Sequence, residues 1–285
     1  MLTKAVIVLL ISLLVWTYQT IIQPPPPNIC GLPGGPPVTS PRIKLSDGRY
    51  LAYRERGVAK EKSEFKIIMV HGFDNSKDMA LVASQGMERV IRIQIARLAG
   101  AALVVPIVNY WWPSFPCHLS REAYKRQLKR DQWKLRIAHY VPGLLYWWMS
   151  QKWFPSSSYV EIVPEVYGNR DKEILKMMSG TLTHNQTVTR QQGVFESLHR
   201  DLMVGFGSWD FDPMELSNPF PHNESFVHIW QGFEDPLVPV KLQQYVCRKL
   251  QWIRYHEVTD GGHLIMYDTN LFEAILRELL LPSGV

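Results

Sequence analysis

The sequence predicts an α/β fold in which a mostly parallel sheet follows an N-terminal transmembrane helix. An uncharged, apolar stretch covers residues 5–22. Later in the chain, continuous apolar runs of strand length recur, which is typical of strands buried on both faces of a parallel sheet. These runs are 66–73, 101–108, 226–232 and 252–258. The long interval between the second and third runs is rich in aromatic residues and predicts an inserted helical region.

The length of 285 residues, with 46% hydrophobic and 20% charged residues, fits one sizeable core. Residues 121–136 account for the net charge of +5, because they contain seven Lys or Arg and only two acidic residues, Glu122 and Asp131 (7 − 2 = +5). Helical spacing after Ser120, which can cap a helix, predicts one helix with a solvated basic face. A second interpretation is attraction to anionic lipid head groups. A nucleic-acid partner is not expected, because it needs a broader basic surface.

Residues 1–23 are predicted to form the membrane anchor. At about 1.5 Å per residue, the 18 residues of 5–22 span about 27 Å, enough for a thin bilayer. A cleaved signal peptide is the alternative, although no small-residue cleavage pattern follows the apolar stretch. Lys4 favours a cytosolic N-terminus and a lumenal body. The sequons at Asn185 and Asn223 agree with this topology, so the endoplasmic reticulum or secretory pathway is the expected location.

Residues 24–41 are rich in Pro and Gly and predict an extended linker that holds the body away from the membrane. Cys30, Cys117 and Cys247 are an odd number, which implies no disulfide framework. The body, residues 42–285, opens with two short strands around the Asp47-Gly48 turn, so a β-hairpin is expected there.

Three segments, taken in chain order, resemble the sequence pattern of a known protein family. The run 66–73 ends in His71-Gly72-Phe73, the run 226–232 leads into Gly232-Phe233-Glu234-Asp235-Pro236-Leu237-Val238-Pro239, and the run 252–258 leads into Gly261-Gly262-His263. Together they resemble the α/β-hydrolase family, in a plant-type branch with an N-terminal membrane anchor. The resemblance implies an oxyanion loop at His71, Gly72 and Phe73, and it implies that Asp235 orients His263 as the general base.

The resemblance also implies a helical lid at about 110–225. Its aromatic pairs, including Trp111-Trp112 and Trp147-Trp148, suit an apolar acyl or ring-bearing ligand, or they only pack the lid on the core. Four scattered histidines lack carboxylate or cysteine neighbours at ligand spacing, so neither a metal site nor a cofactor is expected. These are His139, His184, His199 and His222.

The nucleophile elbow G-x-S-x-G of the family is absent. Residues 74–100, the 27 residues between Phe73 and Ala101, have to replace two central strands and their helices, yet one βαβ unit takes roughly 30 residues. An internal deletion is the interpretation, through splicing, gene erosion or an incomplete gene record. Ser84 is a weak candidate nucleophile, in a degenerate elbow between a strand at 79–83 and a helix at 87–98. Val82 would crowd that turn.

Two functions follow as expectations. The first is a hydrolase of the carboxylic-ester type that is inactive in this form because its nucleophile is missing. The second is a noncatalytic, membrane-anchored protein that binds an apolar ligand or a partner. An epoxide hydrolase using Tyr140 or Tyr146 is a subsidiary hypothesis, but it requires an elbow aspartate that is equally absent.

Overall fold

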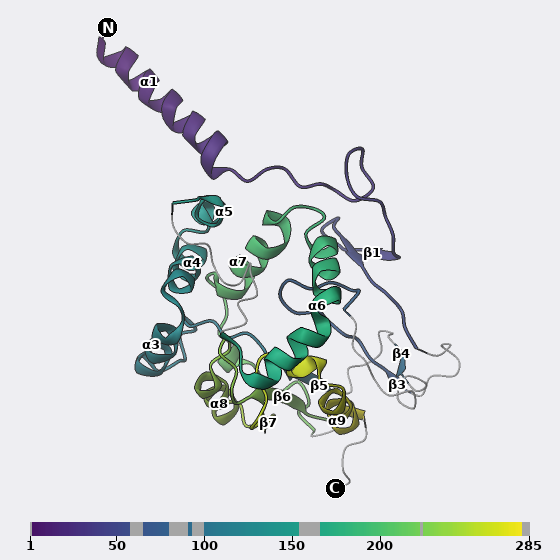
Figure 1. Ribbon diagram of the computed structural model, residues 1–285. Coiled ribbons are helices and arrows are strands. Elements are labelled where there is room, and N and C mark those ends of the chain that lie inside the picture. The colour runs from purple at the N-terminus through teal and green to yellow at the C-terminus, as the bar shows by residue number, and fades with distance from the viewer. Residues whose placement is uncertain are drawn as a thin grey trace.

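The computed structural model describes residues 2–57, 65–79, 91–92, 100–153, 166–222 and 225–280, which form a mixed α/β molecule (Figure 1). Its main sheet contains β5 (Ala101–Val104), β6 (Val227–Gly232) and β7 (Ile253–Val258), all parallel and adjacent in that order. The predicted parallel strands are therefore confirmed at these three positions, although β5 is shorter than the run 101–108.

The two faces of this sheet meet different helices. On one face, Ile229 of β6 packs with Leu242 and Val246 of α8 (Val240–Lys249), whose i, i+4 spacing forms an apolar stripe. The opposite face is covered by α9 (Thr269–Leu280). Two sets of residues in register across β5, β6 and β7 lie on this face: Ala102, His228 and Arg254, and then Val104, Trp230 and His256. In the sequence, α8 occupies the interval between β6 and β7.

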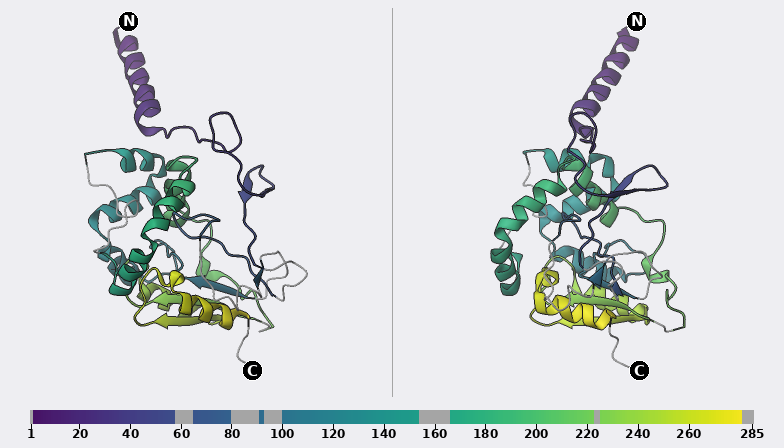
Figure 2. Two further views of the ribbon diagram at one scale, coloured as in Figure 1. Left: turned by 45° about the vertical axis from the view of Figure 1, so that its right-hand side comes forward. Right: turned by 90° about the vertical axis from the view of Figure 1, so that its right-hand side faces the viewer.

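Most of the remaining helices lie between β5 and β6 in the sequence, and Figure 2 shows them stacked on the side of the sheet that faces the N-terminal helix. We call residues 117–215 the helical region. Its core is aromatic: Tyr110, just before it, stacks on Phe206 at 6.2 Å between ring centroids. The helices are α3 (Cys117–Arg126), α4 (Lys129–Tyr140), η3 (Pro142–Leu144), α5 (Leu145–Ser150), α6 (Asn169–Thr189), η5 (Phe195–His199), α7 (Arg200–Phe206) and η6 (Pro213–Glu215).

The basic segment 121–136 is two helices, so the prediction of one solvated helix is wrong. The chain leaves the helical conformation between α3 and α4, where Gln127 has φ −65° and ψ 150°. Ser120 does not cap a helix, because it lies within α3 and its hydroxyl donates to the Tyr110 carbonyl. Lys134 is fully buried and pairs with Asp131 at 3.0 Å. Both residues of this charged pair lie within α4 and are buried, which residue spacing alone could not indicate.

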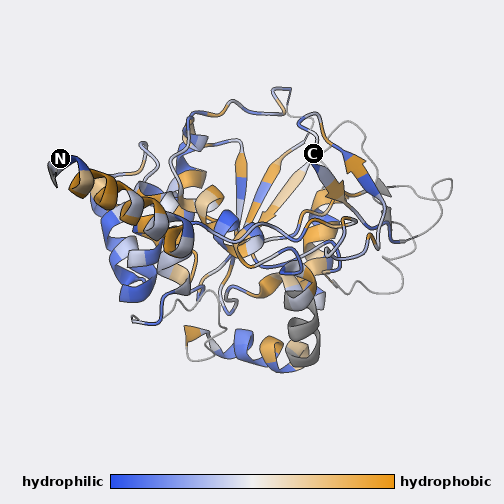
Figure 3. Ribbon diagram, turned by 90° about the horizontal axis from the view of Figure 1, so that it is seen from above, coloured by the Kyte–Doolittle hydropathy of each residue, from blue (hydrophilic) through white to orange (hydrophobic). Residues whose placement is uncertain are grey.

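The N-terminal helix consists of α1 (Leu2–Thr17), continued by the π-helical turn η1 (Tyr18–Ile22). Residues Thr3–Ile22 have a mean hydropathy of 2.2, and none of the 18-residue window lies buried. Figure 3 shows this exposed helix as predominantly hydrophobic. It is long and apolar enough to cross a membrane, a property that signal sequences share.

The Pro-rich linker is not an extended spacer along its whole length, contrary to expectation. The Asn28 amide donates to the Gln192 carbonyl at 3.0 Å, and the Gln192 side chain lies 3.4 Å from the Cys30 sulfur. A closed loop follows, in which the Gly31 amide bonds the Pro36 carbonyl. Gly31, at φ 85°, permits this turn, and proline carbonyls remain free to accept hydrogen bonds.

The predicted hairpin is confirmed by β1 (Arg42–Lys44) and β2 (Tyr50–Ala52), which pair in antiparallel register. Gly48 occupies the turn at φ 88°, a conformation that glycine adopts at little cost.

The predicted buried strand 66–73 is wrong over most of its length. Only β3 (Phe65–Lys66) is a strand, and it pairs in parallel with β4 (Ile91–Arg92), apart from the main sheet. Ile67 is buried, but Ile68 is 52% and Val70 is 83% exposed. An apolar run becomes a buried strand only where neighbouring strands accept its hydrogen bonds, and within the described residues this run has no such neighbour after Lys66.

Candidate functional site

Asp235 and His263 meet beyond the carboxyl ends of two adjacent parallel strands. Asp235 follows β6, His263 follows β7, and Nδ1 of His263 lies 2.9 Å from Oδ2 of Asp235. A carboxylate only accepts hydrogen bonds, so Nδ1 is the donor and Nε2 is the nitrogen available to a reacting group. The Asp235 side chain has no exposed surface, whereas that of His263 is 28% exposed. The carboxylate of the pair is therefore buried, and the imidazole is accessible to solvent.

The Asp235 carboxylate is fixed by its own turn. Oδ1 accepts hydrogen bonds from the amides of Leu237 at 2.8 Å and Val238 at 2.9 Å. The Gln231 side-chain amide donates to Oδ2 at 3.3 Å, beside the bond from His263. Aspartate favours such turns because its short side chain reaches amides two and three residues ahead. The position of the carboxylate is thus fixed by hydrogen bonds other than the one from the imidazole.

Glycines bring the two turns into direct backbone contact. A Cβ on Gly232 would lie 2.2 Å from the Gly262 carbonyl oxygen and 2.5 Å from that of Gly261. The amides of Phe233 and Glu234 donate across the same junction to the carbonyls of Val258 and Gly261, both at 2.9 Å. Gly232 is therefore required by this close approach.

A second carboxylate, which the sequence analysis missed, holds the histidine segment. Asp171, in the first turn of α6, accepts hydrogen bonds from the backbone amides of His263 at 2.8 Å and Leu264 at 2.9 Å. It is completely buried, and burial raises its pKa although the two amides oppose this. No local motif marks Asp171, because its partners lie more than ninety positions away.

The environment of His263 favours its protonated form. Burial alone would lower the pKa of the imidazole, but the carboxylates of Asp235 and Asp171 outweigh it and the net direction is upward. A general base must be neutral at the start of a reaction, so this site would act as a base best above the raised pKa.

The predicted oxyanion residues lie on an irregular loop. His71 and Gly72 are exposed, Nδ1 of His71 lies 3.0 Å from the Gly72 carbonyl oxygen, and Phe73 packs on the main core. Asp74 has a φ of 51°. Its carboxylate accepts two hydrogen bonds from the Arg190 guanidinium, at 3.2 Å from Nε and 2.6 Å from Nη2. Asn75 reaches the histidine segment by donating to the Tyr267 hydroxyl at 2.6 Å. No hydrogen bond between described residues joins His71 or Gly72 to the Asp235–His263 pair.

Ser84, the weak candidate nucleophile, lies outside the described residues. The helix that its elbow requires over 87–98 conflicts with β4, which is a strand at Ile91–Arg92. Tyr140, proposed for epoxide chemistry, is 65% exposed, and Tyr146 packs edge-on against Phe195. Within the described part of the chain, neither tyrosine has a hydrogen bond to the acid–histidine pair.

Two of the histidines considered for metal binding have other surroundings. His139 stacks on Trp111 at 4.3 Å and bonds the Phe206 carbonyl at 2.8 Å. His199 is buried, and this burial lowers its pKa to about 4. A different group of possible ligands, His228, His256 and Glu278, comes together beneath α9. The sequence pattern gave no sign of it, because its members lie on three separate elements.

No protein-family model and no curated protein matches this chain.

Proposed function

We propose that this chain is a membrane-anchored relative of the α/β-hydrolases that keeps the acid–histidine half of a serine-hydrolase site and lacks the nucleophile. The observation that carries the proposal is the 2.9 Å contact between Asp235 and His263, at the ends of adjacent parallel strands. In such sites the carboxylate fixes the tautomer of the imidazole, which then accepts a proton from the nucleophile.

The absent elbow decides what chemistry remains. Serine attack and acyl-enzyme formation need a hydroxyl at the tip of a strained strand-to-helix turn. A histidine held by an aspartate can still draw a proton from water, but removal of a triad member leaves only a small part of the rate. The chain is therefore proposed to be inactive as a serine hydrolase and to form no covalent intermediate, with at most a small residual rate through activated water.

A fluorophosphonate probe tests the loss of the nucleophile. On the full chain in detergent we expect no labelling above that of the Ser84→Ala variant, because the probe modifies activated serines. Labelling of the wild type that disappears in Ser84→Ala and in His263→Gln would contradict the proposal. His118→Gln, a matched change at an exposed residue of α3, is the control.

Peptide mass spectrometry of native material tests the proposed deletion. Peptides across residues 77–97 should match the printed sequence if this form is made. Finding only a longer peptide that carries G-x-S-x-G would assign the activity to a longer form of the protein.

A second candidate function is the binding of an apolar ligand without catalysis. The observation that favours it is an aromatic cluster on and after α5, where the Trp147 and Trp153 rings lie 6.4 Å apart and Trp153 is 79% exposed. Quenching of tryptophan fluorescence by a brominated fatty acid, reduced in Trp153→Ala but not in Trp16→Ala, would support this function. Equal quenching in both variants would exclude this cluster as the binding site.

A further inference from the structure

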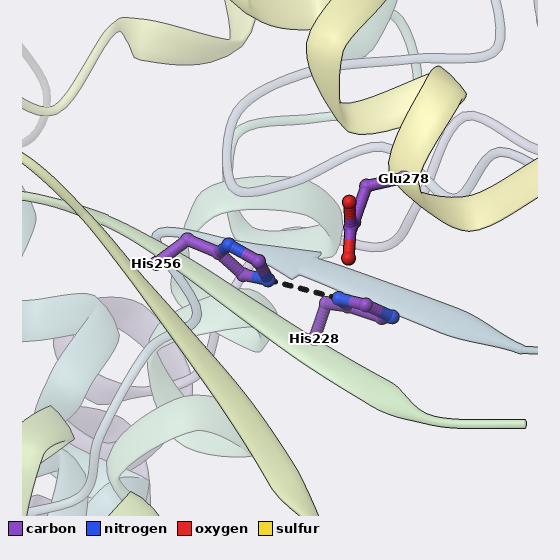
Figure 4. A group of neighbouring side chains, drawn as sticks. All are labelled: His228, His256 and Glu278. Atoms are coloured by element: carbon purple, nitrogen blue, oxygen red, sulfur yellow. Dashed lines mark hydrogen bonds between the residues drawn. The ribbon is translucent and has the colours of Figure 1, made fainter. Parts of the chain in front are cut away.

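Three side chains that can bind a metal converge on the face of the main sheet beneath α9. His228 comes from β6, His256 from β7 and Glu278 from α9, and one ligand atom from each lies within 4.8 Å of the others (Figure 4). Nδ1 of His228 and Nε2 of His256 are 2.9 Å apart. Figure 4 shows the two rings on neighbouring strands, with the Glu278 side chain extending from the helix toward them.

Strand register explains why the imidazoles meet. His256 is paired with Trp230, and His228 lies two residues before Trp230, so all three side chains share one face of the sheet. The Trp230 ring stacks on His256 at 4.1 Å with an interplanar angle of 6°. His228 is 4% exposed, and the Glu278 side chain is 27% exposed. The two imidazole rings are therefore held on adjacent paired strands and are partly shielded from water. The Glu278 carboxylate approaches them from α9.

The ligand atoms of the group also suit a cation. Neutral imidazole is the form that binds metals. Glu278 supplies a negative charge and is paired weakly, at 3.6 Å, with Arg254. That guanidinium lies 3.4 Å from the centre of the Phe226 ring, an alternative partner that it keeps when the carboxylate turns to a metal.

We propose that His228, His256 and Glu278 form a binding site for a divalent transition-metal ion of the zinc type. Two imidazole nitrogens and one carboxylate are a ligand set that Zn²⁺ accepts, with a fourth position left for water. Tetrahedral bonds of about 2.0–2.1 Å place two nitrogens about 3.3 Å apart, so the observed pair has to open by only a few tenths of an ångström. The metal would take the place of the proton that now bridges the two rings, and that proton would move to the other nitrogen of the imidazole that carries it, so that both rings stay neutral.

The proposed site is separate from the Asp235–His263 pair, because its ligands lie within the strands and α9 rather than in the turns beyond them. A metal bound there would connect β6, β7 and α9. An ion that binds the folded chain and not the unfolded one stabilises the fold in proportion to its concentration. The site therefore predicts a structural effect that is independent of hydrolysis.

Zinc titration of the full, tag-free chain in detergent tests the proposal, with competition by a chromophoric chelator as the readout. We expect one zinc ion per chain. Loss of an outer partner already weakens metal affinity by about 10–100-fold, so loss of a ligand in His256→Gln or Glu278→Gln should weaken it at least as much. His118→Gln, which removes an exposed histidine on α3, should leave the affinity unchanged.

The Arg254→Gln variant should change the zinc affinity in the opposite direction to the ligand variants. Removing the competing cation should tighten zinc binding several-fold, which a misfolded variant could not do. The unfolding temperature of the wild type should rise with zinc, and that of Glu278→Gln should not. Equal zinc affinity in the wild type, Glu278→Gln and Arg254→Gln would overturn the proposal, and these two variants decide the matter even if His256→Gln does not fold.

Discussion

Asp171 shows how much of the candidate site depends on single residues far from its motifs. It holds the backbone of His263 and Leu264 from a helix that begins more than ninety residues earlier. Gly262 makes this contact possible, since a Cβ there would lie 2.2 Å from Oδ2 of Asp171. The motif glycines and Asp235 could be recognised from sequence because each stands in a short motif directly after an apolar run. Asp171 could not, because neither spacing nor periodicity connects it to the histidine.

Replacing Gly262 with alanine should destabilise the fold. The new methyl group meets a buried carboxylate that is itself fixed by two amides, so overpacking should cost about 2 kcal/mol of the free energy of unfolding. Denaturant unfolding of the chain measures this cost. Gly143→Ala is the control, because a Cβ at Gly143 meets nothing within 4 Å and should change stability by less than about 0.5 kcal/mol. Equal stabilities would show that the Asp171 contact is not tight.

At the scale of the elements, the sequence predicted strands well only where neighbouring strands exist. β6 and β7 match their apolar runs because each pairs along its length. The run after Lys66 is just as apolar, yet it is left without a strand partner in the described residues, and Val70 turns to solvent. Periodicity reports which side chains favour burial and cannot report whether a partner strand is present. The α3–α4 break was missed for a similar reason, since tertiary packing buries Lys134.

The buried Lys134–Asp131 pair should be sensitive to removal of one partner. Lys134→Met leaves the buried carboxylate without its lysine and should cost about 3–5 kcal/mol of the free energy of unfolding. The double variant Asp131→Leu/Lys134→Met should be more stable than the single one, because the buried carboxylate that has lost its lysine is then removed as well. A double variant less stable than Lys134→Met would contradict this account.

The same pair has a pH signature. Burial lowers the pKa of Lys134 to about 7, so between about pH 7 and pH 10 the unfolded chain binds the proton that the folded chain has released. The free energy of unfolding of the wild type should therefore rise with pH over this window, relative to that of Lys134→Met. Denaturant unfolding at several pH values measures the difference. Parallel curves for the two proteins would exclude a lowered pKa.

For the whole molecule, α1 and η1 form an apolar helix, and none of its 18-residue apolar window is buried against the described residues. Deleting residues 2–22 should abolish flotation of the protein with neutral phosphatidylcholine vesicles, because the exposed apolar surface that favours the bilayer is removed. The truncated chain should also remain unbound with anionic vesicles. Flotation with anionic vesicles alone would instead assign lipid binding to the basic helices α3 and α4.

The hydrogen bond from Asn28 to Gln192 limits how far the N-terminal helix can lie from the helical region. Asn28 lies only six residues beyond Ile22, a length that reaches about 20 Å when fully extended. With α1 in a bilayer, the α6–α7 connection and α5 would therefore stand close to the lipid head groups, on the side of the molecule that Figures 1 and 2 show facing the anchor. Trp153 is exposed, its ring lies 6.4 Å from that of Trp147 in α5, and tryptophan favours the membrane interface. The apolar ligand proposed above would then reach the helical region by sideways diffusion out of the lipid, and its supply would follow its concentration in the membrane rather than its solubility in water.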